Sequence, residues 1–257
     1  MKKLLLTLAY VGTEFCGWQV QAKGLRTVQA TVQDAIEAVY GERHSLTGCS
    51  RTDAGVHAKA FRAAYILPEN SPDIPLDRLP LALNLKLPYD CAVIKAEYVP
   101  LPFHPRYDAV YKEYKYLFED TVHRDPFMDK RCWRFHRPLD ETAMDEASKA
   151  FLGTHDFSAF MSTGGKIEDT KRTVTDISVS RENGFVVLTI RADGYLYNMV
   201  RIIAGTLAMT SYGKINPSEL PSIIESGDRN RAGMTAPPEG LYLTEVGYLE
   251  GFAKLNR

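Results

Sequence analysis

The segment GCSRTDAGVHA, residues 48–58, concentrates side chains that could do chemistry. It carries a carboxylate at Asp53, a guanidinium at Arg51 and an imidazole at His57. One interpretation is a surface turn, because aspartate followed by glycine two residues later is common in turns. The other is a nucleophilic carboxylate that a nearby guanidinium keeps ionised, since a positive charge lowers the pKa of a carboxyl group. Taken alone, the segment favours the turn.

Two further segments combine cations with aromatic or apolar side chains. FHPRYDAVYKEYKY, residues 103–116, interleaves four tyrosines, among them Tyr114, with arginine and lysines. This pattern suits either a surface that stacks bases and neutralises phosphates, or the edge of a solvated strand. In GYLYNMVRIIAG, residues 194–205, Arg201 stands within an apolar helical stretch. It is either a rim residue with its charged head in water or the partner of a buried carboxylate.

Several common kinds of site have no matching motif in the sequence. The six histidines and four cysteines lack zinc-ligand spacing, so we expect no catalytic metal. There is neither a P-loop nor a G-x-G-x-x-G motif, so we expect no nucleotide cofactor. A glycosidase would need a second carboxylate near Asp53, for which Asp193 is a candidate, and this class stays an alternative.

The composition is that of an ordinary globular protein. The chain has 257 residues, of which 45% are hydrophobic and 25% are charged. Its formal net charge is −1, so a polyanionic partner would need a local basic groove. The four cysteines are widely spaced, as expected of free thiols in a reducing compartment. The apolar run near the N-terminus is too short for a signal peptide, and no run reaches the roughly 20 residues of a membrane span. We therefore expect a cytoplasmic protein.

Residue periodicity predicts the elements that would position these side chains. Residues 28–40 place apolar side chains on one helical face, with Thr27 as the N-cap and Gly41 at the end. The Asn183-Gly184 pair predicts a hairpin between two strands. Further strands are expected at 3–11, 61–67, 91–99, 107–118 and 241–249, and further helices near 76–84, at 140–152, at 198–211 and from 216 onward.

The long hairpin indicates antiparallel sheet, so we expect an α+β fold. The strands and helices divide into two halves of similar content. These are residues 1–102, which carry Asp53, and residues 103–257, which carry Tyr114 and Arg201. We expect the two halves to share a cleft.

Four motifs, in order along the chain, resemble the TruA family of tRNA pseudouridine synthases. They are SRTDAGVHA, FHPRYDAVYKEYKY, YNMVRIIAGTL and TAPPEGLYL, and FCGWQVQ and HDFSAF match as well. The resemblance covers nearly the whole chain. It implies an isomerase that converts uridine to pseudouridine at positions 38 to 40 of the tRNA anticodon arm, without cofactor or catalytic metal. It also implies two pseudosymmetric halves around an antiparallel sheet flanked by helices, a positively charged active-site cleft, and a homodimer.

The resemblance assigns roles to five residues. Asp53 corresponds to the catalytic nucleophile and Arg201 to the arginine that pairs with it. Tyr114 corresponds to the tyrosine that stacks on the target base, and Leu241 to the leucine that packs against it. Arg51 resembles the arginine that helps to hold the nucleotide out of the stack.

Two other expectations bear on these assignments. His57 should be structural, because an imidazole in a tight loop more often bonds backbone than catalyses, and Gly55 should let the chain turn tightly behind the carboxylate. The main alternative function is a tRNA-binding or folding module without turnover, which the basic and aromatic segment 103–116 would support alone.

Overall fold

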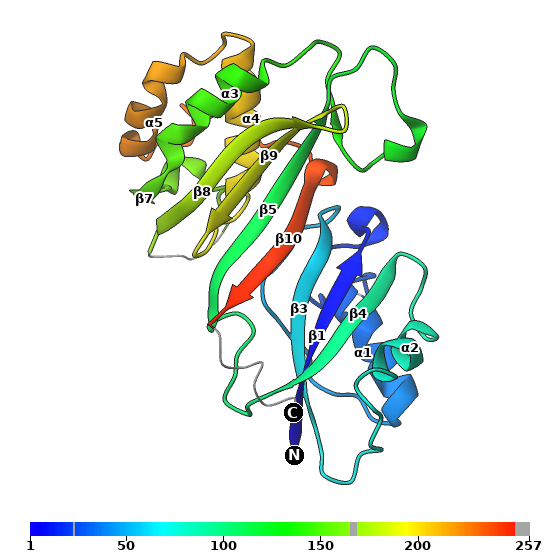
Figure 1. Ribbon diagram of the computed structural model, residues 1–257. Coiled ribbons are helices and arrows are strands. Elements are labelled where there is room, and N and C mark those ends of the chain that lie inside the picture. Colours follow the sequence, from blue (N-terminus) through cyan, green and yellow to red (C-terminus); the bar gives the residue numbers. More distant parts are fainter. Residues whose placement is uncertain (23, 165–168, 250–257) are drawn as a thin grey trace. The chain divides into compact units, whose positions relative to one another are not determined.

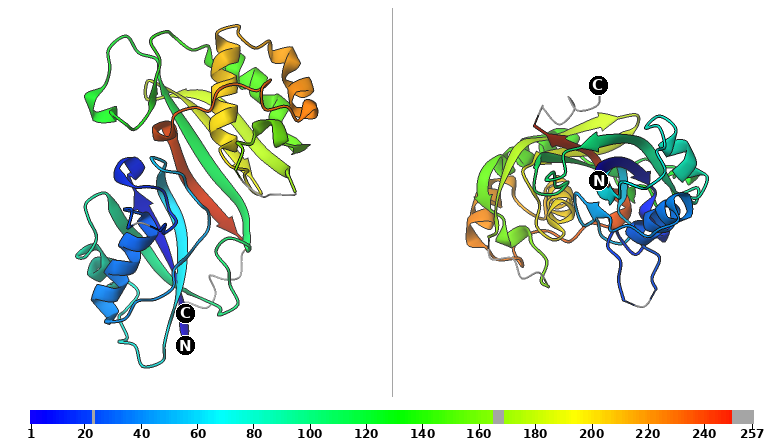
Figure 2. Two further views of the ribbon diagram at one scale, coloured as in Figure 1. Left: turned by 180° about the vertical axis from the view of Figure 1, so that it is seen from behind. Right: turned by 90° about the horizontal axis from the view of Figure 1, so that it is seen from below.

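The computed structural model describes residues 1–22, 24–164 and 169–249 (Figure 1). The chain divides into two compact units, one of Met1–Val110 with Leu243–Arg257 and one of Tyr111–Tyr242. In each unit the helices lie on one face of a sheet (Figure 2). The predicted α+β class is confirmed. The predicted halves, 1–102 and 103–257, stay a prediction, and they differ from these units in where the last strand belongs.

The first unit is built on the strand order β4-β1-β3-β10. Its central strand β1 pairs antiparallel with both β3 and β4. The elements are β1 (Lys2–Tyr10), the 3-10 helix η1 (Gly12–Glu14), α1 (Val28–Tyr40), β2 (Thr47–Gly48), β3 (His57–Leu67), α2 (Leu79–Asn84), β4 (Cys91–Val99) and β10 (Leu241–Tyr248), whose first two residues belong to the second unit.

The second unit is built on the strand order β5-β9-β8-β7. The short strand β6 pairs parallel with the end of β5, while β5, β9, β8 and β7 pair antiparallel in turn. Its strands are β5 (Ala109–Glu119), β6 (Trp133–Arg134), β7 (Gly153–Asp156), β8 (Lys171–Glu182) and β9 (Phe185–Ala192). Its helices are α3 (Glu141–Ser148), α4 (Met199–Ser211) and α5 (Leu220–Ser226), and its 3-10 helices are η2 (Pro126–Met128), η3 (Lys149–Phe151), η4 (Ser158–Phe160), η5 (Pro217–Glu219) and η6 (Pro238–Gly240).

The elements with the strongest local signals form where the sequence predicts them. In α1, the Thr27 side chain accepts a hydrogen bond from the Ala30 N–H at 3.3 Å, and Gly41 ends the helix with φ 80°. The hairpin between β8 and β9 turns at Asn183 and Gly184, which both have positive φ. Both predictions are confirmed because they depend on neighbours in the sequence.

Other elements differ from the prediction in extent. The helix expected over 140–152 is α-helical only to Ser148, and its last turn tightens into η3. The strand expected from residue 61 begins earlier, at His57. Strands β6 and β7, of two and four residues, were not predicted, because so few residues carry no measurable periodicity. No helix in the described part of the chain has the length and apolar content that crossing a membrane requires.

Candidate active site

Asp53 lies half-buried in the loop that connects β2 to β3 in the first unit. Backbone hydrogen bonds tie this loop to the segment after η1. The Thr52 carbonyl accepts from the Trp18 N–H at 3.0 Å, and the Gly55 N–H donates to the Phe15 carbonyl at 3.3 Å. The backbone of the loop is therefore bonded to the FCGWQVQ segment.

Gly55 and His57 shape the chain immediately after Asp53. Gly55 has φ +81°, a conformation that costs about 1–2 kcal/mol for a residue with a side chain. His57 is 1% exposed, and its Nδ1 accepts a hydrogen bond from the Gly12 N–H at 2.9 Å. The backbone contact predicted for His57 is confirmed, and so is the tight turn predicted at Gly55. Arg51, two residues before Asp53, is exposed.

Arg201 lies in the first turn of α4 in the second unit, and it is half-buried. Its Nε donates to the Ala236 carbonyl at 2.7 Å, and its Nη1 donates to Asn198 Oδ1 at 2.7 Å. The Ala236 N–H returns a bond to the Arg201 carbonyl at 3.0 Å. The arginine is thus fixed at its backbone and at its guanidinium, so little side-chain freedom is left to lose when it acts on a ligand.

Asn198 is the residue that makes this arrangement possible, and sequence reasoning missed it. It precedes α4 with φ 62°, in the left-handed region that asparagine tolerates better than most residues. Its side chain makes no capping bond to the helix. Instead, Oδ1 accepts from Arg201, and Nδ2 donates to Ser162 Oγ at 3.0 Å. Asparagine before a helix usually indicates a cap, so the local pattern pointed to another role.

Tyr114 lies on β5 and is 6% exposed. The ring of Tyr195 meets it edge-on, with centroids 5.0 Å apart and planes at 87°. Burial raises the pKa of Tyr195 well above its ordinary value, so its hydroxyl stays protonated. That hydroxyl lies 2.9 Å from the carbonyl oxygens of Lys112 and Ile190. Tyr195 is thus bonded to β5 and β9 while its ring packs on Tyr114, which restricts the position of the Tyr114 ring. Sequence reasoning missed this contact as well.

The segment of residues 235–241 connects Arg201 to β5. On one side Ala236 bonds Arg201, and on the other the Tyr116 hydroxyl donates to the Pro237 carbonyl at 2.8 Å. A Cβ at Gly240 would stand 2.5 Å from Cζ of Tyr116, so the close approach requires glycine. Tyr116 has a pKa raised well above its ordinary value, first by burial. It therefore remains a hydrogen-bond donor.

Leu241 follows directly, as the first residue of β10, and is 6% exposed. The second unit thus holds three of the predicted site residues, Tyr114, Arg201 and Leu241, on elements joined through residues 235–241. The first unit holds Asp53 and Arg51. The two sets of residues come from different motifs, which lie about 60 residues or more apart in the sequence.

The described residues offer neither a metal site nor a reactive thiol among Cys91 and Cys132. Within 1–22, 24–164 and 169–249, no three His, Cys, Asp or Glu side chains gather as a metal site would need. The four cysteines are not in disulfide bonds, and burial raises the pKa of Cys91 and of Cys132 to about 12. Those two thiols are protonated at neutral pH and behave as small apolar side chains.

Comparison with known proteins defines the class. A family model described as tRNA pseudouridine synthase matches residues 7–108 and 147–249. The chain belongs to the family of tRNA pseudouridine synthases, which makes it an isomerase. The resemblance noted from the four motifs is confirmed.

Within this family, the chain is similar to proteins named tRNA pseudouridine synthase A. It is 46% identical over 248 residues to the one from Acetivibrio thermocellus, covering 96% of this chain and 100% of that protein. It is 43% identical to the one from Thermoanaerobacter sp. strain X514 over 248 residues, with the same coverage of both chains. The relative from Ruminiclostridium cellulolyticum is 42% identical over 249 residues, again covering 96% of this chain and 100% of the relative.

Proposed function

We propose that the protein isomerises uridine to pseudouridine at positions 38 to 40 of the tRNA anticodon arm, with Asp53 as the nucleophile. The observation that carries the proposal is the RTDAGVH loop in a chain 46% identical, over 96% of its length, to a tRNA pseudouridine synthase A. We further propose that it works in the cytoplasm as a homodimer that binds tRNA. No cofactor enters the proposed reaction.

The reaction moves one bond of the uracil base. The C1′–N1 bond breaks, the base turns, and a C1′–C5 bond forms, while C5 loses a proton and N1 gains one. The target nucleotide must first leave its stack, which costs a few kcal/mol. An aromatic ring under the base recovers about 1–3 kcal/mol, and Tyr114 is the residue proposed for that contact. Leu241 would pack against the base, and Arg51 would help to hold the nucleotide outside the stack.

Asp53 must be ionised to act, and Arg201 is proposed as its counter-charge. Two features of the chain support these roles. The loop on either side of Asp53 is held by backbone hydrogen bonds to Trp18 and Phe15, which fix where the carboxylate leaves the chain. The Arg201 guanidinium is oriented by Ala236 and Asn198 before any ligand arrives. Such preorganisation avoids a reorganisation cost during the reaction.

The test incubates the purified chain with unmodified tRNA transcripts and maps pseudouridine by chemical labelling and mass spectrometry. The expected product lies at positions 38 to 40, and a transcript with cytidine at those positions serves as the matched control. Absence of product from the wild type contradicts the proposed activity.

The nucleophile is tested separately by Asp53→Asn. We expect the rate to fall by about 1,000-fold or more, because amide and carboxylate are isosteric but only the carboxylate is nucleophilic. Asp77→Asn, at an exposed position of the same unit, is the control. Turnover that survives in Asp53→Asn would contradict the role of Asp53. For the homodimer, light scattering should give twice the 28.8 kDa mass of the chain.

A further inference from the structure

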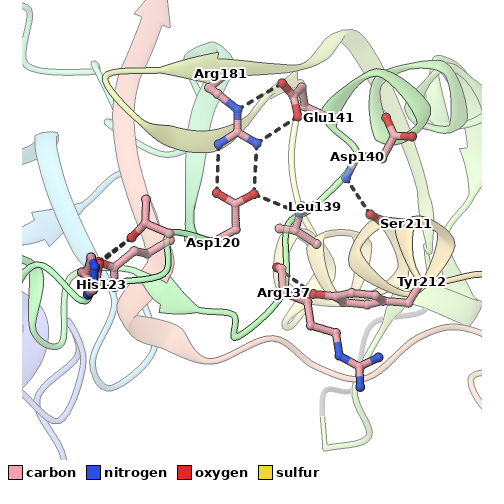
Figure 3. Close-up of polar contacts among 11 residues, drawn as sticks. Asp120, His123, Arg137, Leu139, Asp140, Glu141, Arg181, Ser211 and Tyr212 are labelled. Carbon is pink, nitrogen blue, oxygen red and sulfur yellow. Dashed lines mark hydrogen bonds and ion pairs between the residues drawn. The ribbon is translucent and has the colours of Figure 1, made fainter.

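Residues 121–138, here called the basic arm, belong to the second unit and form its connection between β5 and α3 (Figure 1). Their ends meet at Asp120. Its Oδ2 accepts from the Leu139 N–H at 2.8 Å, and Arg181 of β8 donates to its two oxygens at 2.9 and 3.0 Å (Figure 3). These contacts at Asp120 close the two ends of the segment against β8.

Further contacts anchor the base of the basic arm to the helices. Glu141, at the start of α3, accepts two hydrogen bonds from Arg181 at 3.0 and 2.9 Å. The Tyr212 hydroxyl, just after α4, donates to the Arg137 carbonyl at 3.2 Å (Figure 3). The base of the arm is therefore tied to β8, α3 and α4 together.

The interior of the basic arm is ordered by hydrogen bonds and aromatic packing. Strand β6 pairs with the end of β5, and the Asp125 N–H donates to Glu119 Oε1 at 2.6 Å. The Tyr242 hydroxyl donates to the Arg131 carbonyl at 2.5 Å. The rings of Phe118, Trp133, Phe135 and Tyr212 follow one another at centroid distances of 4.3–6.0 Å. The arm thus keeps its shape without a partner, which lowers the entropy cost of binding one.

The surface of the basic arm is cationic in a chain whose net charge is −1. It has five Lys or Arg residues against two Asp residues. The cations are Arg124, Lys130, Arg131, Arg134 and Arg137, of which all but Arg134 are exposed. Phe127 stands among them with 85% of its surface exposed. Exposed arginines around an accessible aromatic ring suit a ligand with phosphates and stacking bases.

We propose that the basic arm binds the phosphate backbone of the RNA substrate, and that Phe127 stacks on an unpaired base. The inference rests on the proposed function, which supplies the RNA. The arm falls between residues 7–108 and 147–249, the two segments that the family model matches. It contains none of the residues proposed for the reaction. Its contribution is therefore to the affinity for tRNA, and the chemical step is left to Asp53 and Arg201.

The test measures tRNA binding by the full chain as a function of salt. The variant Arg124→Gln/Lys130→Gln/Arg131→Gln removes three exposed charges from the arm. Each phosphate contact contributes a slope of about 0.7–0.9 to the fall of log affinity with log salt. We expect the slope to become shallower by about 2, and the Kd near 0.1 M salt to rise by about tenfold or more.

The matched control is Lys86→Gln/Lys171→Gln/Lys214→Gln, which removes three exposed charges elsewhere. It should leave the slope within about 0.5 of the wild type. Phe127→Ala should raise the Kd by about fivefold or more without changing the slope, because stacking releases no counterions. Because the arm is proposed to act on affinity, both arm variants should raise KM by a larger factor than they lower kcat.

Three outcomes would overturn the inference. The first is an arm variant with the slope and Kd of the control. The second is an unchanged slope together with a change of oligomeric mass, which would make the arm a protein interface. The third is a loss of affinity in the control variant equal to that in the arm variant, which would show that the affinity depends on the net charge of the chain and not on the arm. The binding assay does not require turnover. A wild type that binds tRNA but forms no pseudouridine would therefore contradict the proposed function, while the salt dependence of the arm variant would still test the arm.

Discussion

Asp53 and Arg201 lie on two segments that are built differently. The Asp53 loop is held by its backbone, through bonds to Trp18 and Phe15 and a glycine with positive φ. Arg201 is held through its own side chain, by the Ala236 carbonyl and Asn198 Oδ1. Backbone atoms therefore carry the bonds that hold the aspartate segment, whereas the arginine is held by bonds of its own side chain within the second unit.

Because of this difference, we expect substitutions at the two segments to affect activity and stability differently. Changes to the Asp53 side chain should cost activity and leave the loop in place. Changes to the backbone of that loop should cost both. Around Arg201, substitution of a residue that bonds its side chain should lower the reaction rate, because the guanidinium is then less well oriented.

After Asp53→Asn, the largest effect is expected for Arg201→Ala. It removes the proposed counter-charge and leaves two acceptors without their donor, so kcat should fall by about 100- to 1,000-fold, measured in single-turnover assays. The melting temperature should fall as well, because each of the two lost bonds involves a charged group and is worth about 1.5–3 kcal/mol. Arg201→Lys should recover only part of the rate, since an ammonium cannot reproduce the planar fork. A rate within threefold of the wild type would remove Arg201 from the mechanism.

The next effect tests the backbone of the Asp53 loop. Gly55→Ala puts a side chain at φ +81° and should cost about 1–2 kcal/mol of the free energy of unfolding, together with a loss of kcat. Gly213→Ala is the matched control, because Gly213 has φ +66° with open space around it and lies outside the proposed site. It should lose stability alone. Equal kcat in the two variants would mean that the loop geometry does not matter to the reaction.

A smaller effect is expected for Asn198→Ala, which removes the contact to Nη1 of Arg201. We expect kcat to fall by about tenfold with KM unchanged, since one hydrogen bond to a charged group is worth about 1.5–3 kcal/mol. Asn198→Asp should restore most of the rate, because aspartate can accept the same bond. In combination with Arg201→Ala, the Asn198→Ala change should add little. Full additivity of the two would show that Asn198 does not act through Arg201.

The smallest effect concerns the base of the basic arm, where the contacts are ionic. Hydrogen bonds from Arg181 hold the pKa of Asp120 and of Glu141 below their ordinary values of 3.8 and 4.5. Groups whose pKa is lowered on folding stabilise the protein above their unfolded pKa, and this stabilisation is lost as the pH falls through the folded value. Acid unfolding of the wild type should therefore steepen below about pH 4.5.

In Arg181→Gln, the loss of unfolding free energy between pH 6 and pH 3 should be smaller than in the wild type by about 1 kcal/mol. Denaturant unfolding at a series of pH values measures this acid-induced loss. Arg43→Gln is the control, because Arg43 pairs with Asp34 and Glu37 on an exposed surface. It should leave the acid-induced loss of stability unchanged. The same acid-induced loss in Arg181→Gln and in the wild type would show that the base of the arm is not held by charge.

The elements that the sequence predicts best are those with local causes. Helix α1 carries its cap at Thr27 and its stop at Gly41, and the β8–β9 turn carries Asn183-Gly184. The turn at Gly55 belongs with them because it depends on the glycine itself, whereas the partner of His57, Gly12, lies 45 residues earlier in the chain. For these segments, the neighbouring residues already restrict the backbone.

The neighbours of Tyr114 and Arg201 could not be predicted in the same way. Tyr195 follows Tyr114 by 81 positions in the sequence, and Ala236 follows Arg201 by 35. Asn198 is local, yet its side chain turns away from the cap that its position indicates. Which long-range partner a side chain meets depends on how strands pair and helices pack, and no short pattern records it.

The sequence by itself determined the family, the class of fold and the residue types proposed for the reaction. It did so because ordered motifs and local periodicity are properties of neighbouring residues. Only the tertiary structure decided how Arg201 is held, and that residues 121–138 close into a rigid cationic arm. Asp120 and Arg181, 61 residues apart, meet only because β8 passes beside the end of the arm. Their contact requires both strands to be folded, so it is absent from any stretch of the sequence taken alone.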